Sequence, residues 1–132
     1  MLAEIETAFG QRLAIAPAIA PIVWPNKAAS PDKPYLSVQH VPTSNDSGDI
    51  SGAGGEVQRG YFVVTVVTSS NTFSSLANTT AQAVKARFPM GLTLTAGTRK
   101  MRFWRPAQML PAFADEADWR LPIRLNYLVS GR

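Results

Sequence analysis

The sequence of 132 residues contains no cysteine and a single histidine, His40. The lack of cysteine excludes disulfides, thiolate metal sites and cysteine nucleophiles. One histidine excludes a multi-histidine metal cage, and any catalytic triad would have to use His40. No apolar run approaches the roughly 20 residues that a membrane-spanning helix needs. The first residues include Glu4 and Glu6 and no basic segment, so we expect no signal peptide and a cytosolic location.

Charged residues are also scarce, at 17%, below the usual value of about 25%. Hydrophobic residues make up 45%, which is ordinary for a folded chain, and the length predicts one domain. The net charge of +4 is unevenly placed. Residues 1–66 hold four Lys/Arg and six acids (−2), and residues 67–132 hold nine and three (+6). This asymmetry predicts two differently charged faces, suited to nucleic acid, an acidic partner or head-to-tail self-association.

Hydrophobic periodicity predicts two helices and several strands. Apolar residues three and four apart predict helices over 2–15 and 73–88. Alternation and turn residues predict the strands 22–24, 35–41, 57–68, 92–96, 99–104 and 119–129. Because neighbouring strands have short connections, the expected fold class is α+β, with one mostly antiparallel twisted sheet and two main helices on one face.

The strand 57–68 is apolar on both faces, so both faces should be covered. A helix can cover one face, and the other needs a second layer or another subunit. In the strand 119–129, Arg120 and Arg124 project from the face opposite the core. Arginine among aliphatic and aromatic residues is typical of protein interfaces. Ordinary exposed arginine on a solvated sheet is an equally good interpretation.

Two connections lack a strand pattern. In the segment 43–56, eleven of fourteen residues are Ser, Thr, Asn, Asp or Gly. Such a segment buries too little apolar surface to offset its ordering entropy, so we expect a mobile polar loop, with the strand before it ending before Pro42. The segment 106–118 is predicted to be a second irregular connection.

No catalytic signature is present. The sequence has no Gly-x-Ser-x-Gly elbow, and the glycines of 52–55 lack the Gly-Lys-Ser/Thr of a phosphate loop. Asp115, Glu116 and Asp118 lack the spacing of a calcium loop, and loop solubility explains them better. His40 lies on a strand flank where a structural role is expected. The sequence therefore predicts no enzyme, no metal site and no cofactor.

A basic cluster with interleaved aromatic residues is the best case for nucleic-acid binding. It consists of Arg99, Lys100, Arg102 and Arg105, with Phe103 and Trp104 between them. Bases can stack on aromatic rings while cations bind phosphates. No RNA-recognition or helix-turn-helix motif accompanies the cluster. An edge strand protected by charge, or a protein interface, is the favoured interpretation.

Several stretches in order resemble a known family. They are the N-terminal helix followed by Ile22-Val23-Trp24-Pro25-Asn26, then Pro34-Tyr35-Leu36-Ser37-Val38, Arg59-Gly60-Tyr61-Phe62-Val63-Val64-Thr65-Val66, Ala86-Arg87-Phe88-Pro89 and Asp118-Trp119-Arg120-Leu121-Pro122-Ile123-Arg124-Leu125-Asn126-Tyr127. Together they resemble the small tail terminator proteins of long-tailed bacteriophages, over nearly the whole chain. That family has no catalytic motif to carry over.

The resemblance implies a structural virion protein that assembles into a ring of six subunits. Such a ring caps the tail tube, stops addition of tube protein and presents a surface for head joining. The implied partners are other copies of the chain, the tail tube protein and a head-completion or neck protein, with DNA only as passing cargo. No membrane partner or cofactor is implied, and the expected location is the virion tail, assembled in the host cytoplasm.

Three groups of residues are the interface candidates. Arg120 and Arg124 are expected at subunit or lumen contacts, and the basic cluster at a charged ring surface or a DNA passage. The loop residues are expected to engage the tube or neck: Asp46, Gly48, Asp49 and Gly54. Two alternatives remain open. One is a neck or minor tail protein without length control, and the other is a single-stranded nucleic-acid binding module that uses Phe103 and Trp104.

Overall fold

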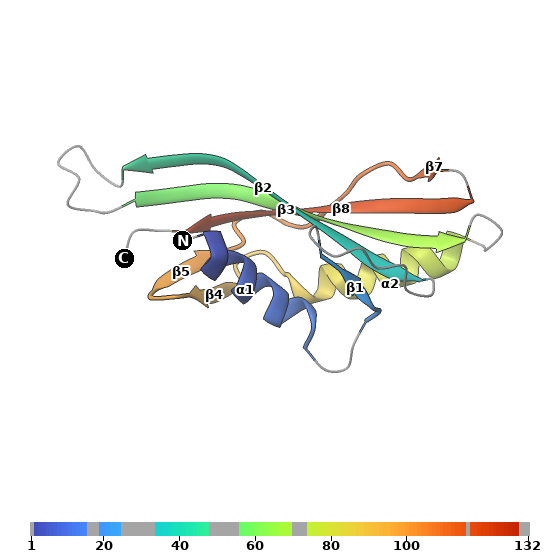
Figure 1. Ribbon diagram of the computed structural model, residues 1–132, viewed down its shortest axis with the longest axis horizontal. Coiled ribbons are helices and arrows are strands. Elements are labelled where there is room, and N and C mark those ends of the chain that lie inside the picture. Colours follow the sequence, from blue (N-terminus) through green and yellow to red (C-terminus); the bar gives the residue numbers. More distant parts are fainter. Residues whose placement is uncertain are drawn as a thin grey trace.

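Residues 2–15, 19–24, 34–47, 56–69, 74–115 and 117–129 are described by the computed structural model of the chain. Within these ranges the chain forms two helices and one sheet, and both helices pack on the same side of the sheet (Figure 1). The helices are α1 (Leu2–Leu13) and α2 (Ser74–Arg87). The strands are β1 (Ile22–Val23), β2 (Tyr35–Ser47), β3 (Glu56–Ser69), β4 (Thr93–Ala96), β5 (Arg99–Arg102), β6 (Gln108–Met109), β7 (Phe113–Asp115) and β8 (Asp118–Val129). The predicted α+β class is confirmed.

The sheet is built around β8. The strand order is β1-β2-β3-β8-β5-β4, and every pair except β1–β2 is antiparallel. One edge of β8 pairs with β3 along its whole length. The other edge is shared by β7, β6 and β5 in turn. The short strands β6 and β7 lie in the segment 106–118 that we expected to be irregular, so that prediction was wrong. Their pairing satisfies backbone groups of β8 that would otherwise form an open edge.

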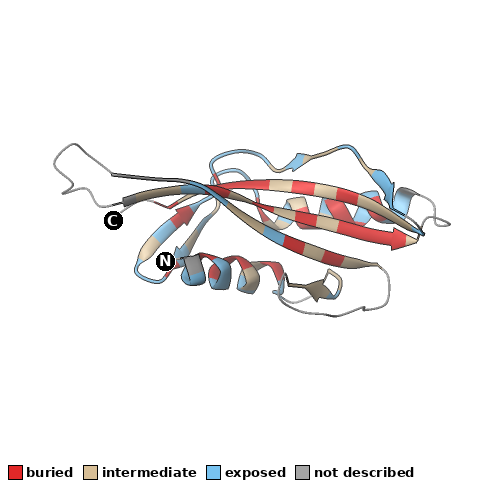
Figure 2. Cartoon of the chain, turned by 45° about the horizontal axis from the view of Figure 1, so that its top comes forward, coloured by how far each residue is buried: buried red, intermediate tan, exposed pale blue. Residues whose placement is uncertain are grey.

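The core lies between the sheet and the two helices. The predicted stripe of α1 is buried at Ile5, Phe9 and Leu13, with at most 1% of each residue exposed. The Phe9 ring stacks on Phe62 of β3, with the ring centroids 3.8 Å apart, and on Phe88 at 4.8 Å. Each such apolar side chain contributes about 1.5–3 kcal/mol when it leaves water. Along the central strands, buried residues alternate with less buried ones, as Figure 2 shows.

The two helices are joined at their C-terminal ends by a reciprocal pair of arginines. Arg12 Nε donates a hydrogen bond to the carbonyl oxygen of Arg87 at 2.8 Å. In return Arg87 Nη1 donates to the carbonyl oxygen of Leu13 at 2.7 Å. The last carbonyls of a helix have no partner within the helix, and cations favour this negative end of the helix dipole. Each arginine therefore caps the helix to which it does not belong.

The strand β2 continues beyond the point at which we expected it to end. It passes Pro42 and reaches Ser47, while β3 begins at Glu56, so the ends of the predicted loop 43–56 are paired strand. The register shifts between Pro42 and Ser44. Proline lacks the ladder donor, but a bulge at this position lets the pairing resume on the far side. The middle of the predicted loop lies outside the described residues, and its mobility stays a prediction.

The remaining predicted elements are present. The hairpin of β4 and β5 turns at Gly97-Thr98 as expected, and Gly97 has a φ of 64°, which favours glycine. The predicted edge strand at Ile22 pairs parallel with β2. Among the described residues, neither helix is long and apolar enough to cross a bilayer.

Candidate functional site

One face of the central strands points away from both helices, and we call it the open sheet face. By register, it carries the residues between the core positions of β2, β3 and β8. They are Tyr35, Ser37, Gln39 and Val41 of β2, Tyr61, Val63, Thr65 and Val67 of β3, and Arg120, Pro122, Arg124, Asn126 and Leu128 of β8. Gln39, Val63 and Arg124 form one row across the three strands, and the neighbouring row is Ser37, Thr65 and Pro122.

The two faces of β3 differ in burial. Phe62, Val64 and Val66 on the helix side are fully buried. On the open sheet face, Tyr61, Val63 and Thr65 are half-buried, whereas Val67 is fully buried. The sequence predicted that both apolar faces of this strand need cover. The helices supply it on one side, and the described residues of the subunit supply part of it on the other.

The guanidinium of Arg124 lies over an aromatic ring on the open sheet face. Its guanidinium carbon is 3.9 Å from the centroid of the Tyr61 ring, a cation–π contact. Arg124 Nε is buried and has no hydrogen-bond acceptor among the described residues. The same holds for Nδ2 of Asn126, a residue that is 5% exposed. A buried donor without an acceptor costs about 1–3 kcal/mol, so each of these two groups lowers the stability of the subunit.

Arg120, the other candidate on this face, forms ion pairs within the subunit, although its Nε, like that of Arg124, has no hydrogen-bond acceptor among the described residues. Its Nε lies 3.2 Å from Asp115 Oδ2, and its Nη2 donates to Asp118 Oδ2 at 3.4 Å. This pairing gives two of the acidic residues of the expected loop a structural role beyond solubility. Glu116 lies outside the described residues. No group of three or more metal-ligating side chains occurs in the described parts of the chain.

The basic cluster lies on the hairpin of β4 and β5 and in the turn that follows it. Lys100, Arg102 and Arg105 are exposed and Arg99 is half-buried. Trp104 is 41% exposed, and the Arg105 guanidinium carbon lies 4.2 Å from its ring centroid. The cluster therefore presents exposed cations beside one exposed aromatic ring.

Phe103 does not belong to this exposed surface. It is 1% exposed and packs edge-on against Phe88 at 5.1 Å, within the core. Our proposal that Phe103 and Trp104 stack on bases together was wrong for Phe103. The alternation along this stretch turns one aromatic ring inward and the next outward.

Of the four candidate residues in the loop, only Asp46 lies within the described residues. Asp46 lies in β2 at the register position opposite Val57 of β3. Gly48, Asp49 and Gly54 lie outside the described residues. Their engagement of a tube or neck protein stays a prediction.

A polar contact within the core was not expected from the sequence. His40 Nε2 lies 2.6 Å from the Tyr127 hydroxyl, and His40 Nδ1 lies 3.4 Å from Glu6 Oε1. The His40 ring stacks on Phe62 with a centroid separation of 4.4 Å. Burial, and secondarily the charge of Glu6, raises the pKa of Tyr127 to about 12. His40 is thus a packed structural residue, as predicted, and its partners come from distant parts of the chain.

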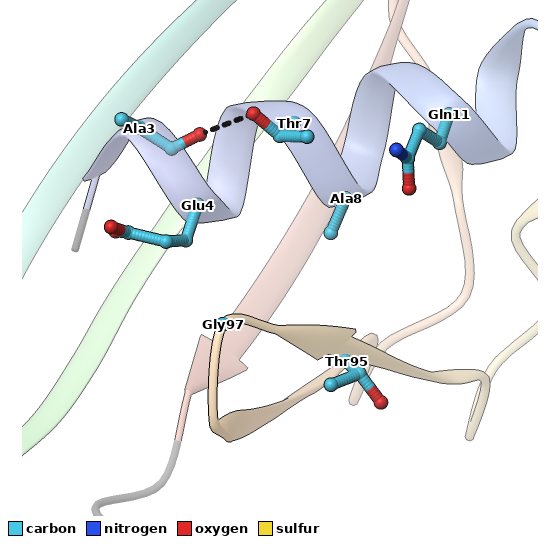
Figure 3. Close-up of a pocket in the computed structure, with 7 residues that line it drawn as sticks. All are labelled: Ala3, Glu4, Thr7, Ala8, Gln11, Thr95 and Gly97. Carbon is cyan, nitrogen blue, oxygen red and sulfur yellow. Dashed lines mark hydrogen bonds between the residues drawn. The ribbon is translucent and has the colours of Figure 1, made fainter.

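The outer side of α1 is lined by small residues with a hollow on either side. One hollow lies between α1 and the turn of β4 and β5, as Figure 3 shows. It is lined by Ala3, Glu4, Thr7, Ala8, Gln11, Thr95 and Gly97. The second hollow, on the other side of the helix, is lined by Ala3, Glu6, Thr7, Gly10, Gln11 and Trp24. Both hollows contain Thr7, whose hydroxyl donates a hydrogen bond to the backbone carbonyl of Ala3 at 2.8 Å within the helix.

Comparisons with known proteins agree with this reading. A family model described as "Phage tail terminator protein" matches residues 4–127. One solved structure, whose title states no function, is 30% identical, with a TM-score of 0.77 over 98% of this chain and 95% of that chain. A chain of a structure titled "Virion of native gene transfer agent (GTA) particle" is 18% identical and shares the fold, with a TM-score of 0.72 over 98% and 97% of the two chains. None of the curated proteins matches.

Proposed function

The chain belongs to the phage tail terminator protein family, and from this membership we propose that it forms a ring that caps the tail tube. Members of the family are structural proteins of the phage tail. The proposed ring mimics the tube end on one side and offers no docking surface for the next tube subunit on the other. The other side then presents a surface for joining the head, and the subunit performs no catalysis.

The open sheet face is the observation that supports a ring most directly. Tyr61 and Val63 are half-buried in the single subunit, and Arg124 and Asn126 hold buried donors that lack acceptors among the described residues. Tyrosine, arginine and aliphatic side chains together are the composition of protein interfaces. A neighbouring copy would cover the half-buried apolar side chains.

The basic cluster is proposed to lie on a rim of the ring, away from the contacts between copies. Lys100, Arg102 and Arg105 are exposed cations, and cations of every subunit would add into one positively charged surface. We propose that this surface binds an acidic face of the tube or neck protein. The loop with Asp46, Gly48, Asp49 and Gly54 would engage the same partners.

A role as a single-stranded nucleic-acid binding module is less well supported. Bases stack on exposed aromatic side chains in such modules, and here Phe103 is in the core. Only Trp104 of the pair can meet a base. We therefore retain DNA as cargo that passes the ring.

The test is a measurement of tail length in infected cells that lack this protein. Abnormally long tube polymers, corrected by the wild-type chain supplied in trans, support the capping role. Tails of normal length that fail to join heads contradict capping and support a neck or minor tail protein. Normal tails joined to heads contradict both roles.

A further inference from the structure

We propose that the open sheet face of one subunit is covered by helix α1 of the next subunit. The contact would be front to back, between two different surfaces on opposite sides of the chain. This inference rests on the proposed ring and names the surfaces that close it. A heterologous contact of this kind generates a ring when its rotation closes.

The open sheet face carries a cation that a partner can neutralise. Arg124 is half-buried there, and its guanidinium carbon lies 3.9 Å from the centroid of the Tyr61 ring. Arg120, the other arginine on this face, already has Asp115 and Asp118 as ion-pair partners within the subunit. A carboxylate on a neighbouring copy would complement the charge of Arg124.

Helix α1 carries the acids of the helix layer. Glu4 and Glu6 lie in its first half, whereas the sequence of α2 contains no Asp or Glu. Glu6 already lies near His40, but its side chain is 52% exposed and a carboxylate accepts about four hydrogen bonds. Charge complementarity therefore selects α1 over α2 as the cover for Arg124.

The outer surface of α1 also permits close approach. Between the two carboxylates lies a stripe of two small exposed residues, Ala3 and Thr7, one helical turn apart. Gly10 in the next turn is covered by the Trp24 ring of the same subunit. The stripe is flanked by the two hollows, of which the one beside the β4–β5 turn is shown in Figure 3. The stripe thus supplies shape and the two glutamates supply charge.

Cysteine cross-linking tests the contact directly because the wild-type chain has no cysteine. The variant Thr7→Cys/Thr65→Cys places one thiol on the α1 stripe and one at the centre of the open sheet face. The two positions lie on opposite sides of a subunit, so a bond joins only different copies. The matched control is Asn78→Cys/Thr65→Cys, whose first thiol is on the exposed surface of α2.

Oxidation of purified assemblies followed by denaturing electrophoresis gives the readout. A covalent ladder that ends at the ring number for the Thr7 variant, and is absent for the Asn78 variant, supports the proposal. A ladder for the Asn78 variant alone, or for neither variant when mass measurement finds intact rings, overturns the α1 contact and leaves the ring standing. A wild-type chain that stays monomeric at every concentration and on isolated tails overturns the proposed ring as well.

Charge reversal gives an independent check. Arg124→Glu should raise the dissociation constant of the ring at least about tenfold, and a second change, Glu4→Arg or Glu6→Arg, should recover most of that loss. Lys100→Glu is the control, since it makes the same change in net charge at the hairpin. Equal effects of Arg124→Glu and Lys100→Glu, or no recovery by either glutamate change, contradict the pairing of Arg124 with α1.

Discussion

The Tyr127 hydroxyl lies 2.6 Å from Nε2 of His40, and this contact links the end of β8 to β2 two residues before the bulge at Pro42. On the other side of the imidazole, His40 Nδ1 lies 3.4 Å from Glu6 Oε1. An ionised carboxylate only accepts, so in the neutral histidine Nδ1 carries the proton and Nε2 accepts from Tyr127. The contact holds helix α1 and two strands of the sheet together through one polar chain.

Replacing Tyr127 by phenylalanine should therefore destabilise the subunit. Tyr127→Phe keeps the ring in the core but leaves His40 Nε2 without its donor in a site that is largely closed to water. The expected loss is about 1–3 kcal/mol in the free energy of unfolding. Urea unfolding of a monomeric form measures it. Tyr61→Phe on the open sheet face is the control, and a loss of the same size there would contradict the role given to His40.

The stability of the subunit should fall as the pH rises from about 10 to about 12. The pKa of Tyr127 is raised to about 12 by burial and by the charge of Glu6, whereas an unfolded tyrosine titrates near 10. In this window the unfolded chain loses the proton and the folded chain keeps it, so alkaline pH favours unfolding. The loss is fully developed above the folded pKa and amounts to on the order of 2–3 kcal/mol.

The test measures the free energy of unfolding of the wild-type chain and of Tyr127→Phe at each pH. The contributions of the other titrating groups cancel in the difference between the two chains. The two stability curves should converge between pH 10 and pH 12. Parallel curves across this range would show that Tyr127 does not carry the effect.

Gly60 should not tolerate a side chain. A Cβ at this position would lie 2.6 Å from the Tyr127 hydroxyl oxygen and 2.8 Å from the backbone carbonyl oxygen of Val41. Because one of the two atoms is backbone, the strand itself would have to move, and we expect Gly60→Ala to cost about 1–3 kcal/mol. Thermal unfolding measures the change. Adding Tyr127→Phe should not restore stability, since the contact with Val41 remains, and a full recovery would contradict this account.

Replacement by alanine should lower the free energy of unfolding far more at Phe103 than at its neighbour Trp104. Phe103→Ala removes a ring that is 1% exposed and packs with Phe88 and Phe9, so it should cost about 3–5 kcal/mol. Trp104→Ala removes a ring that is 41% exposed and should cost less than about 1 kcal/mol. Chemical denaturation of the two variants compares them. Losses of similar size would contradict the inward and outward assignment of the two rings.

The variant Trp104→Ala also tests the proposed binding role of the surface around the basic cluster. Because Trp104→Ala should leave the fold intact, its effect on attachment of tube or neck protein reports the exposed surface alone. Phe103→Ala gives no such information, since it acts through the core.

Local patterns in the sequence determined most of the elements. The alternation of residues 119–129 predicted both the strand and its buried side, because side chains on a strand alternate strictly between two faces. Spacings of three and four predicted the buried stripe of α1 at Ile5, Phe9 and Leu13 for the corresponding helical reason. The turn at Gly97 was likewise readable, since few other residues adopt a positive φ there. These properties depend on neighbours within a few positions in the chain.

Only the tertiary structure decided what depends on distant partners. Pro42 does not end β2, because pairing with β3 resumes beyond a bulge, and β6 and β7 form only because β8 offers them an edge. The contact of His40 with Tyr127 joins residues 87 positions apart, and the neutralisation of Arg120 by Asp115 depends on the fold of β7 against β8. Hydrogen bonds and ion pairs act over a few ångströms in space, whereas local patterns report only on nearby positions in the chain. The sequence therefore marked Arg120 and Arg124 alike, and only the folded subunit shows that Arg120 lies against Asp115 and Asp118 whereas Arg124 lies against the ring of Tyr61.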